Sequence, residues 1–182
     1  MAHPECWRGL GAVATYHSGV RSIPSLGSRG EGWVALQLGA IALVAIAGRV
    51  DAAPTSVDPS LAMALRAAGL GLLVFAGLLI LSGSFVLRSA GAFSVLPRPI
   101  SGGEFVASGP YRIVRHPVYA GLILGGLGIA LDRLSVSTLL ATLLLAIILD
   151  LKRRREEQWL VERFPGYGAY RERTKAFVPF VY

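Results

Sequence analysis

The segment GPYRIVRHPVYAG, at residues 109–121, places two arginines, a histidine and two tyrosines directly before a glycine-rich apolar stretch. Pro117 is typical of the first residue of a helix, because its missing N–H is not needed there and its φ is already helical. The next backbone amides then lie at a positive helix end beside Arg115 and His116, and such an end attracts a carboxylate or a phosphate. The pattern leaves two interpretations open: a ligand site, or cationic and aromatic anchors at a membrane surface.

A second polar cluster follows the last apolar stretch, where Glu156 and Glu157 come after four consecutive basic residues. On a helix that ends near Pro165, the two acids have the spacing to pair with Arg153 and Arg154, and such pairs contribute little individually. Alternatively, one glutamate faces inward and accepts hydrogen bonds from the amino or hydroxyl groups of a ligand. Composition does not choose between these interpretations.

Three glycines, Gly121, Gly125 and Gly128, recur at helical spacing in the apolar stretch after the first motif. We favour close helix packing of the small-xxx-small kind as their role. The alternative is that the missing side chains make room for a flat ligand at the Gly121 end. Both roles are compatible at different turns of one helix.

The elements that carry these residues belong to a protein with lipid as its solvent. Hydrophobic residues make up 53% of the 182 residues and charged residues 16%, which is too apolar for an ordinary soluble domain. The net charge of +7 comes from residues between apolar blocks, which suits an anionic membrane surface and not a nucleic acid. The single cysteine, Cys6, excludes an internal disulfide and a multi-cysteine metal site.

Four apolar blocks occur, at residues 33–47, 61–87, 118–131 and 134–151. A membrane-spanning helix needs roughly 20 apolar residues, so the second block is ample and the fourth is adequate. The first block extends to Val50, whereas the third has to begin inside the preceding polar motif. The sequence therefore predicts an all-α integral membrane protein with about four transmembrane helices, a cytoplasmic C-terminal helical segment and a structured loop before the third span.

The distribution of positive charge orients this arrangement. Of the 18 lysines and arginines, 15 precede the first block, lie in the loop at residues 88–117 or follow the fourth block. Because excess positive charge marks the cytoplasmic face, both termini are expected there, in a bacterial inner membrane. Residues 1–32 lack the apolar core of a secretory signal and are interpreted as a cytoplasmic tail. Residues 33–182 then form a single domain, with the ligand-binding part at about 88–182.

Three motifs carry a resemblance to a known family. They are GPYRIVRHPVYAG at residues 109–121, the Glu156 and Glu157 pair, and FPGYGAYRERTKAFVPF at residues 164–180. Together they resemble the C-terminal half of the isoprenylcysteine carboxyl methyltransferases, which belong with the phospholipid N-methyltransferases in a wider group of integral membrane methyltransferases. The resemblance covers roughly residues 75–182. The sequence departs from the family pattern around Tyr167, where acidic residues more commonly follow a phenylalanine and a glycine.

The resemblance implies S-adenosylmethionine as cofactor, bound on the cytoplasmic side, and no metal. Its acceptor would be a lipid-like or hydrophobic carboxylate, amine or thiol that enters from the bilayer. The cofactor-binding residues that it implies are His116, Pro117, Tyr119, Gly121, Glu156 and Glu157, and we add Tyr111 and Arg115 from the same segment. The residues expected near the transferred methyl are Tyr170, Arg173 and Glu157.

Two other hypotheses remain. A membrane reductase of the sterol-reductase type has a similar C-terminal module but uses NAD(P)H, and such proteins are much longer chains. A non-catalytic membrane scaffold would use the motifs only to pack the helices.

Overall fold

The computed structural model describes residues 23–51, 57–94, 96 and 105–179, and most of these residues lie in helices. The helices are α1 (Glu31–Ala47), α2 (Pro59–Ser89), the 3-10 turn η1 (Gly109–Arg112), α3 (Pro117–Arg133), α4 (Val136–Arg163) and α5 (Tyr167–Arg173). The described residues contain an isolated β-bridge but no strand. The prediction of an all-α protein is confirmed for this part of the chain.

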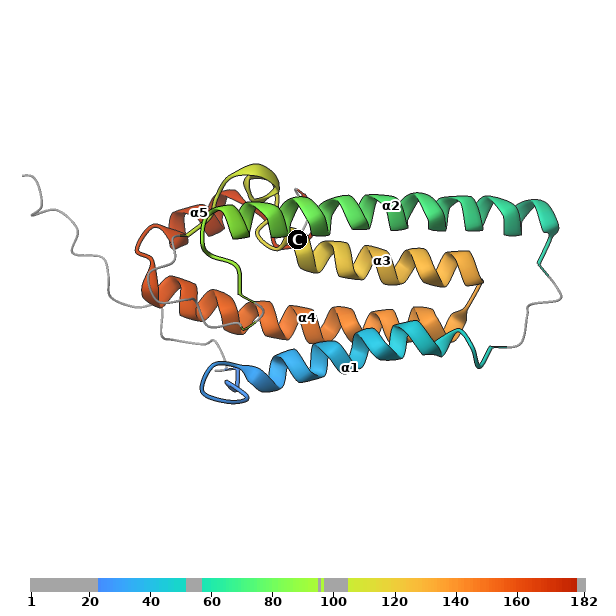
Figure 1. Ribbon diagram of the computed structural model, residues 1–182, viewed down its shortest axis with the longest axis horizontal. Helices are drawn as coiled ribbons and strands as arrows, with labels where there is room; N and C mark the ends of the chain where they lie inside the picture. The colour runs from blue at the N-terminus through green and yellow to red at the C-terminus, as the bar shows by residue number, and fades with distance from the viewer. Residues whose placement is uncertain (1–22, 52–56, 95, 97–104, 180–182) are drawn as a thin grey trace, which may run out of the picture.

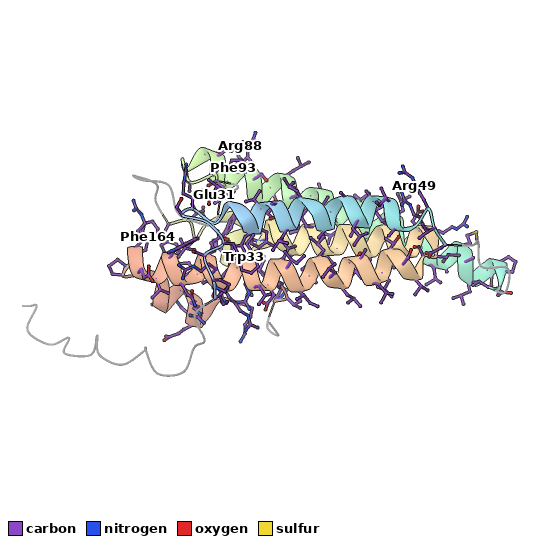
Figure 2. The ribbon with its side chains drawn as sticks, turned by 90° about the horizontal axis from the view of Figure 1, so that it is seen from below. Glu31, Trp33, Arg49, Arg88, Phe93 and Phe164 are labelled. Carbon is purple, nitrogen blue, oxygen red and sulfur yellow. The ribbon has the colours of Figure 1, made fainter. Side chains whose placement is uncertain are left out.

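The four long helices run side by side and alternate in direction (Figure 1). α2 packs along α3, α3 contacts α4, and α1 packs on α4. The start of α1, the end of α2, the start of α3 and the end of α4 therefore lie at one end of the bundle, together with η1 and α5. Figure 2 shows Arg88, Phe93 and Phe164 at this end and Arg49 toward the other. The motif at residues 109–121 and the glutamate pair at the end of α4 thus lie at the same end of the molecule.

Glycines allow α2 and α3 to approach closely. An added Cβ at Gly128 would lie 2.8 Å from the carbonyl oxygen of Gly69, and one at Gly69 would lie 2.7 Å from the carbonyl oxygen of Gly128. At Gly121, an added Cβ would lie 2.6 Å from a side-chain carbon of Ile80. Since contacts below 3.0 Å require the neighbouring helix to move, these positions need glycine for packing. Helix packing, the favoured interpretation of Gly121 and Gly128, is confirmed; at Gly125 the contact is an ordinary one of 3.7 Å.

α1 and α4 are held together by an apolar core between them and by polar contacts at the end of the bundle away from η1 and α5. Ser137 donates a hydrogen bond of 2.7 Å to the carbonyl oxygen of Ala47, and Asp51 accepts hydrogen bonds from Ser135 and Ser137. Buried alanine, valine and leucine side chains fill the space between the two helices, and they are Ala40, Val44, Ala47, Ala141, Leu145 and Leu149. This pairing fixes α1, and with it Gln37, against α4.

Among the described residues, α2 is the helix that is both long and apolar enough to cross a membrane, with 31 residues and a mean hydropathy of 2.5 over its most apolar window. α1 is apolar but has 17 residues, and α3 also has 17. The apolar part of α4 ends at Leu151, but the helix continues for about three turns through the charged cluster to Arg163. The helix predicted after the fourth apolar block is therefore a direct extension of α4.

Parts of two predicted segments lie outside the described residues. Of the predicted tail at residues 1–32, residues 1–22 lie outside, and α1 begins at Glu31. Of the predicted structured loop at residues 88–117, residue 95 and residues 97–104 lie outside. The described part of this loop contains η1 and the segment that leads into α3 at Pro117. Pro117 is the first residue of α3, as its sequence context predicts.

Candidate functional site

The C-terminal segment holds the first motif in place through its backbone. The amide of Arg115 donates to the carbonyl oxygen of Lys175 at 2.8 Å, and the amide of His116 donates to the carbonyl oxygen of Ala176 at 3.0 Å. The Tyr170 hydroxyl on α5 donates to the carbonyl oxygen of Tyr111 at 2.6 Å. Two motifs that are about 60 residues apart in the chain therefore form one unit at the start of α3.

Glu157 lies at the centre of a buried ion-pair cluster behind this unit. Its Oε1 accepts hydrogen bonds from the Arg115 Nε at 2.9 Å and the His116 Nε2 at 3.0 Å. Its Oε2 lies 3.5 Å from a guanidinium nitrogen of Arg153 and 3.4 Å from the Nε of Arg171. Burial alone would raise the pKa of Glu157, but hydrogen bonds from His116 and Arg115, and electrostatic interactions with both side chains, outweigh it and lower the pKa to about 2. Glu157 is therefore ionised at neutral pH, and it ties α4 to the first motif and to α5.

Glu156, the neighbour of Glu157, takes part in a different arrangement. Its Oε2 accepts a hydrogen bond of 2.8 Å from the Tyr119 hydroxyl. The Tyr119 ring stacks on the His116 ring, with centroids 5.3 Å apart and an angle of 7° between the planes. Each of the two predicted glutamates thus holds one side of the motif: Glu157 binds His116, and Glu156 binds Tyr119.

Lys152 lies one helical turn before Glu156 and is almost fully buried, with 1% of its surface exposed. Its Nζ donates to the Gln37 Oε1 on α1 at 2.5 Å and lies 5.1 Å from the centre of the Tyr119 ring. α1 therefore reaches the site through a polar side chain.

A cavity of about 240 Å³ opens between these groups. Six residues that the sequence predicts as functional line it: Tyr111, Arg115, His116, Tyr119, Glu156 and Tyr170. Gln37, Lys152 and Tyr167 line it as well, together with apolar side chains of α2, α4 and the loop before η1. The structure therefore brings most of the predicted residues to one space, at the end of the bundle where α3 begins.

Four other predicted residues do not line the cavity. Glu157 lies behind it in the ion-pair cluster, Pro117 starts α3, and Gly121 faces α2. Arg173 is exposed, and its Nε donates to the carbonyl oxygen of Ala169 within α5. Their proposed contacts with a cofactor or with the transferred methyl stay predictions.

Aromatic rings form one wall of the cavity. The ring centre of Phe105 lies 5.5 Å from that of Tyr167 and 4.9 Å from that of Tyr170, in edge-to-face contacts. Burial raises the pKa of Tyr111, Tyr167 and Tyr170 above the usual value for a tyrosine. These tyrosines are therefore neutral at physiological pH and present apolar faces with hydroxyl groups at their edges.

The cavity has an apolar and aromatic wall and a few converging polar groups, a composition typical of small-molecule sites. The sequence profile of the phospholipid methyltransferase family matches residues 65–166, which include α3, the first motif, Lys152, and both glutamates. The chain belongs to the phospholipid methyltransferase family. This family groups with the isoprenylcysteine carboxyl methyltransferases among membrane methyltransferases, so the resemblance inferred from the motifs is confirmed. The match ends before α5, and it begins after α1.

Two curated relatives are similar to part of this member of the phospholipid methyltransferase family. The cobalt-zinc-cadmium resistance protein CzcN of Cupriavidus metallidurans is 41% identical over 76 residues, which are 41% of this chain and 35% of the relative. The nickel-cobalt-cadmium resistance protein NccN of Alcaligenes xylosoxydans xylosoxydans is 36% identical over 78 residues, which are 42% of this chain and 36% of the relative. The chain thus matches about a third of the length of each. In the described part of the chain, no group of three or more His, Cys, Asp and Glu residues is arranged to hold a metal ion.

Sequence reasoning missed the roles of Gln37 and Lys152. A signal for each was present: Gln37 is a polar residue in the middle of an apolar block, and Lys152 stands four positions before Glu156, on the same helix face. It also missed Tyr167 and Phe105 as cavity residues. Phe105 follows a loop whose path the sequence does not define, so no pattern would have assigned it to the cavity.

Proposed function

We propose that this protein is an S-adenosylmethionine-dependent methyltransferase that acts on a lipid-like or hydrophobic acceptor at the cytoplasmic face of a membrane. The observation that carries the proposal is one cavity that gathers residues from all three motifs, in a chain whose residues 65–166 match a methyltransferase family. Its polar groups are few and its walls are apolar and aromatic.

The groups that line the cavity fit the chemistry of this cofactor. The aromatic wall of Phe105, Tyr111 and Tyr167 suits an adenine ring, and the Glu156 carboxylate suits ribose hydroxyls or an amino group. Tyrosine ring faces also attract positive charge, which suits a sulfonium. The hydrogen bond of 2.8 Å that Glu156 accepts from the Tyr119 hydroxyl orients the Glu156 carboxylate before a ligand binds.

The cofactor supplies an activated methyl group, so the protein has to align an acceptor and exclude water. Tyr119 and Glu156 hold and orient the bound molecule, and the ring stack of Tyr119 on His116 fixes the tyrosine. Arg115 is part of the cavity wall, and Glu157 holds it in place from behind. A carboxylate acceptor needs no general base in this scheme, whereas an ammonium acceptor first loses a proton. Tyr170 and Arg173 are proposed near the transferred methyl on the basis of the family resemblance.

We further propose that α1, α2, α3 and the apolar part of α4 all cross the membrane, with both termini in the cytoplasm. Large apolar side chains are exposed along the helices, among them Phe85 at 71% and Leu140 at 61%, which suits contact with lipid chains. The helices alternate in direction, and the charged extension of α4 lies at the same end as the cavity. The cofactor would then enter from the cytoplasm and the acceptor from the bilayer.

The proposal is tested by incubating the purified protein in nanodiscs with methyl-labelled S-adenosylmethionine and a bacterial lipid extract. We expect label in the organic phase with the wild type and a loss of most of that label with Glu156→Gln. Absence of label with the wild type, together with absence of cofactor binding, contradicts the proposal. Displacement of a bound cofactor analogue by NADPH would instead favour the reductase hypothesis.

A further inference from the structure

Lys152 and Gln37 form a polar end of the cavity that the proposed roles above do not use. Both line the cavity, and they come from different helices, Lys152 from α4 and Gln37 from α1. The hydrogen bond of 2.5 Å between them orients the ammonium group, and the Tyr119 ring lies on another side of it at 5.1 Å. The cavity thus has an oriented cation on its wall.

Burying the Lys152 ammonium group costs free energy, and this cost needs an explanation. A buried ammonium loses its hydration, and the Gln37 oxygen, the Tyr119 ring face and the nearby Glu156 charge are among the contacts that return part of that loss. Gln37 is itself 9% exposed and stands in an otherwise apolar part of α1. Polar side chains in such helices are kept mainly where they bind a ligand or another helix.

The position of the pair relative to Glu156 indicates which ligand group it binds. Lys152 and Glu156 are one helical turn apart on the same face of α4, and both line the cavity. The cavity therefore presents a cation and an anion side by side. An ammonium group carries three N–H donors, so it has the capacity to bond Gln37 and also an anionic oxygen.

We propose that Lys152, positioned by Gln37, binds the carboxylate of a ligand in this cavity. Two ligands offer that group: the amino-acid part of S-adenosylmethionine, in which case the inference rests on the function proposed above, or an acidic amphiphilic acceptor. In both cases the ligand carboxylate accepts hydrogen bonds from the Lys152 ammonium. Gln37 lies outside the family match at residues 65–166, so its contribution is a feature of this chain beyond that match.

The competing explanation is that the pair only ties α1 to α4. It predicts that replacing Lys152 lowers stability without changing which ligands bind. A ratio of affinities for ligands that differ only in the carboxylate-bearing part separates the two explanations, because a loss of stability affects both ligands alike.

The first arm measures the affinity of the full chain in nanodiscs for S-adenosylhomocysteine and for 5′-methylthioadenosine, which lacks the amino-acid part. We expect Lys152→Met to reduce the preference for S-adenosylhomocysteine by about tenfold or more, as for loss of a hydrogen bond to a charged group. Lys152→Arg keeps the charge and is expected to retain most of the preference. Gln37→Leu removes the positioning contact and is expected to give an intermediate loss.

The second arm measures the thermal stabilisation of the same proteins by palmitate and by palmitamide, without cofactor. If the acceptor supplies the carboxylate, palmitate stabilises the wild type more than palmitamide does, and Lys152→Met removes the difference. The two arms are independent. If the wild type binds neither S-adenosylhomocysteine nor 5′-methylthioadenosine, the proposed function is contradicted, and the comparison of palmitate with palmitamide alone then tests the role of Lys152. Lys152→Gln is carried alongside, so that the result does not depend on the folding of one variant.

A change in either ratio supports the inference and identifies the source of the carboxylate. The inference is overturned if Lys152→Met and Lys152→Gln alter neither ratio, or if the wild type shows neither preference. Unchanged ratios together with normal binding of S-adenosylhomocysteine would leave the proposed function intact and assign the pair to helix packing.

Discussion

Replacing the two adjacent glutamates one at a time, by glutamine, is expected to have different consequences. Glu157→Gln should mainly lower stability, and Glu156→Gln should mainly lower ligand affinity. Glu157→Gln removes the negative charge that contacts Arg115, His116, Arg153 and Arg171. The buried guanidinium groups of Arg115 and Arg153 then lose this partner. The Glu157 side chain is 3% exposed, so water does not compensate. The folded protein should therefore lose stability, whereas its cavity wall keeps the same lining groups.

The size of this loss follows from the pKa of Glu157, which falls from 4.5 to about 2 on folding. A shift of that size corresponds to roughly 3 kcal/mol in favour of the folded state at neutral pH. Breaking a buried ion pair typically costs about 3–5 kcal/mol, which agrees. For a chain of this length the loss corresponds to a decrease of roughly 6–12 °C in the midpoint of thermal unfolding.

The pH dependence has a definite sign, because the folded-state pKa is lowered. The stabilisation from Glu157 is fully present above pH 4.5 and disappears as the pH falls toward about 2. Thermal unfolding of wild type and Glu157→Gln, measured from pH 7 down to pH 3, should therefore give midpoints that converge in acid. Equal midpoints at pH 7 would refute the ion-pair account.

Glu156→Gln is the matched control. Glu156 is half-buried and accepts a hydrogen bond from Tyr119, which a glutamine amide oxygen also accepts. Its charge also acts on the buried Lys152, whose contacts with Gln37 and the Tyr119 ring remain in the variant. We expect a change in stability of less than about 1 kcal/mol but a loss of affinity for S-adenosylhomocysteine of about tenfold. A Glu156→Gln protein that is less stable than Glu157→Gln would contradict the division of roles between the two residues.

The other predictions concern packing and the C-terminal unit. Gly121→Ala should destabilise the protein, because the new Cβ would lie 2.6 Å from a side-chain carbon of Ile80. Gly125→Ala should be tolerated, because its nearest contact is at 3.7 Å. Thermal unfolding of both variants checks this, and equal midpoints would contradict it. Tyr170→Phe removes the 2.6 Å hydrogen bond to the Tyr111 carbonyl oxygen in η1. It should lower the free energy of unfolding by about 1 kcal/mol, measured by denaturation, and weaken cofactor binding, measured by calorimetry. Unchanged stability and unchanged binding would argue against the C-terminal unit. Arg173→Ala should leave the unfolding midpoint unchanged, since its side chain is exposed, and should lower turnover in the labelled-lipid assay; full activity would remove Arg173 from the catalytic set.

Much of the fold was predictable because each helix has its own signal. The first three apolar blocks set the extents of α1, α2 and α3 to within a few residues, and Pro117 starts α3 as expected. The fourth block gives the start of α4, but α4 continues past the end of that block to Arg163. Glycine spacing predicted the close approach of α3 to another helix, and the structure identifies that helix as α2. The sequence determines the number of membrane crossings less well than the helices themselves. α3 ends at Asp132 and Arg133 after 17 residues, and the first 18 residues of α4 already include three charged residues.

The candidate site was predictable by residue type but not by direction. Successive residues on a helix point about 100° apart, so one of two adjacent glutamates was bound to face elsewhere. Packing against Tyr119 or against Arg115 decides which one lines the cavity, and that contact joins residues about 40 positions apart. Gln37 was missed for the same reason, because its partner Lys152 is 115 positions away.

The central claim is that the cavity at the start of α3 binds S-adenosylmethionine, and titration calorimetry with S-adenosylhomocysteine tests it most directly. The account predicts saturable binding at one site per chain by the wild type in nanodiscs. It also predicts that Tyr119→Phe, which releases Glu156, weakens that binding, whereas Gly125→Ala leaves it unchanged. No binding by the folded wild type, or equal binding by wild type and by Glu156→Gln, would contradict the claim.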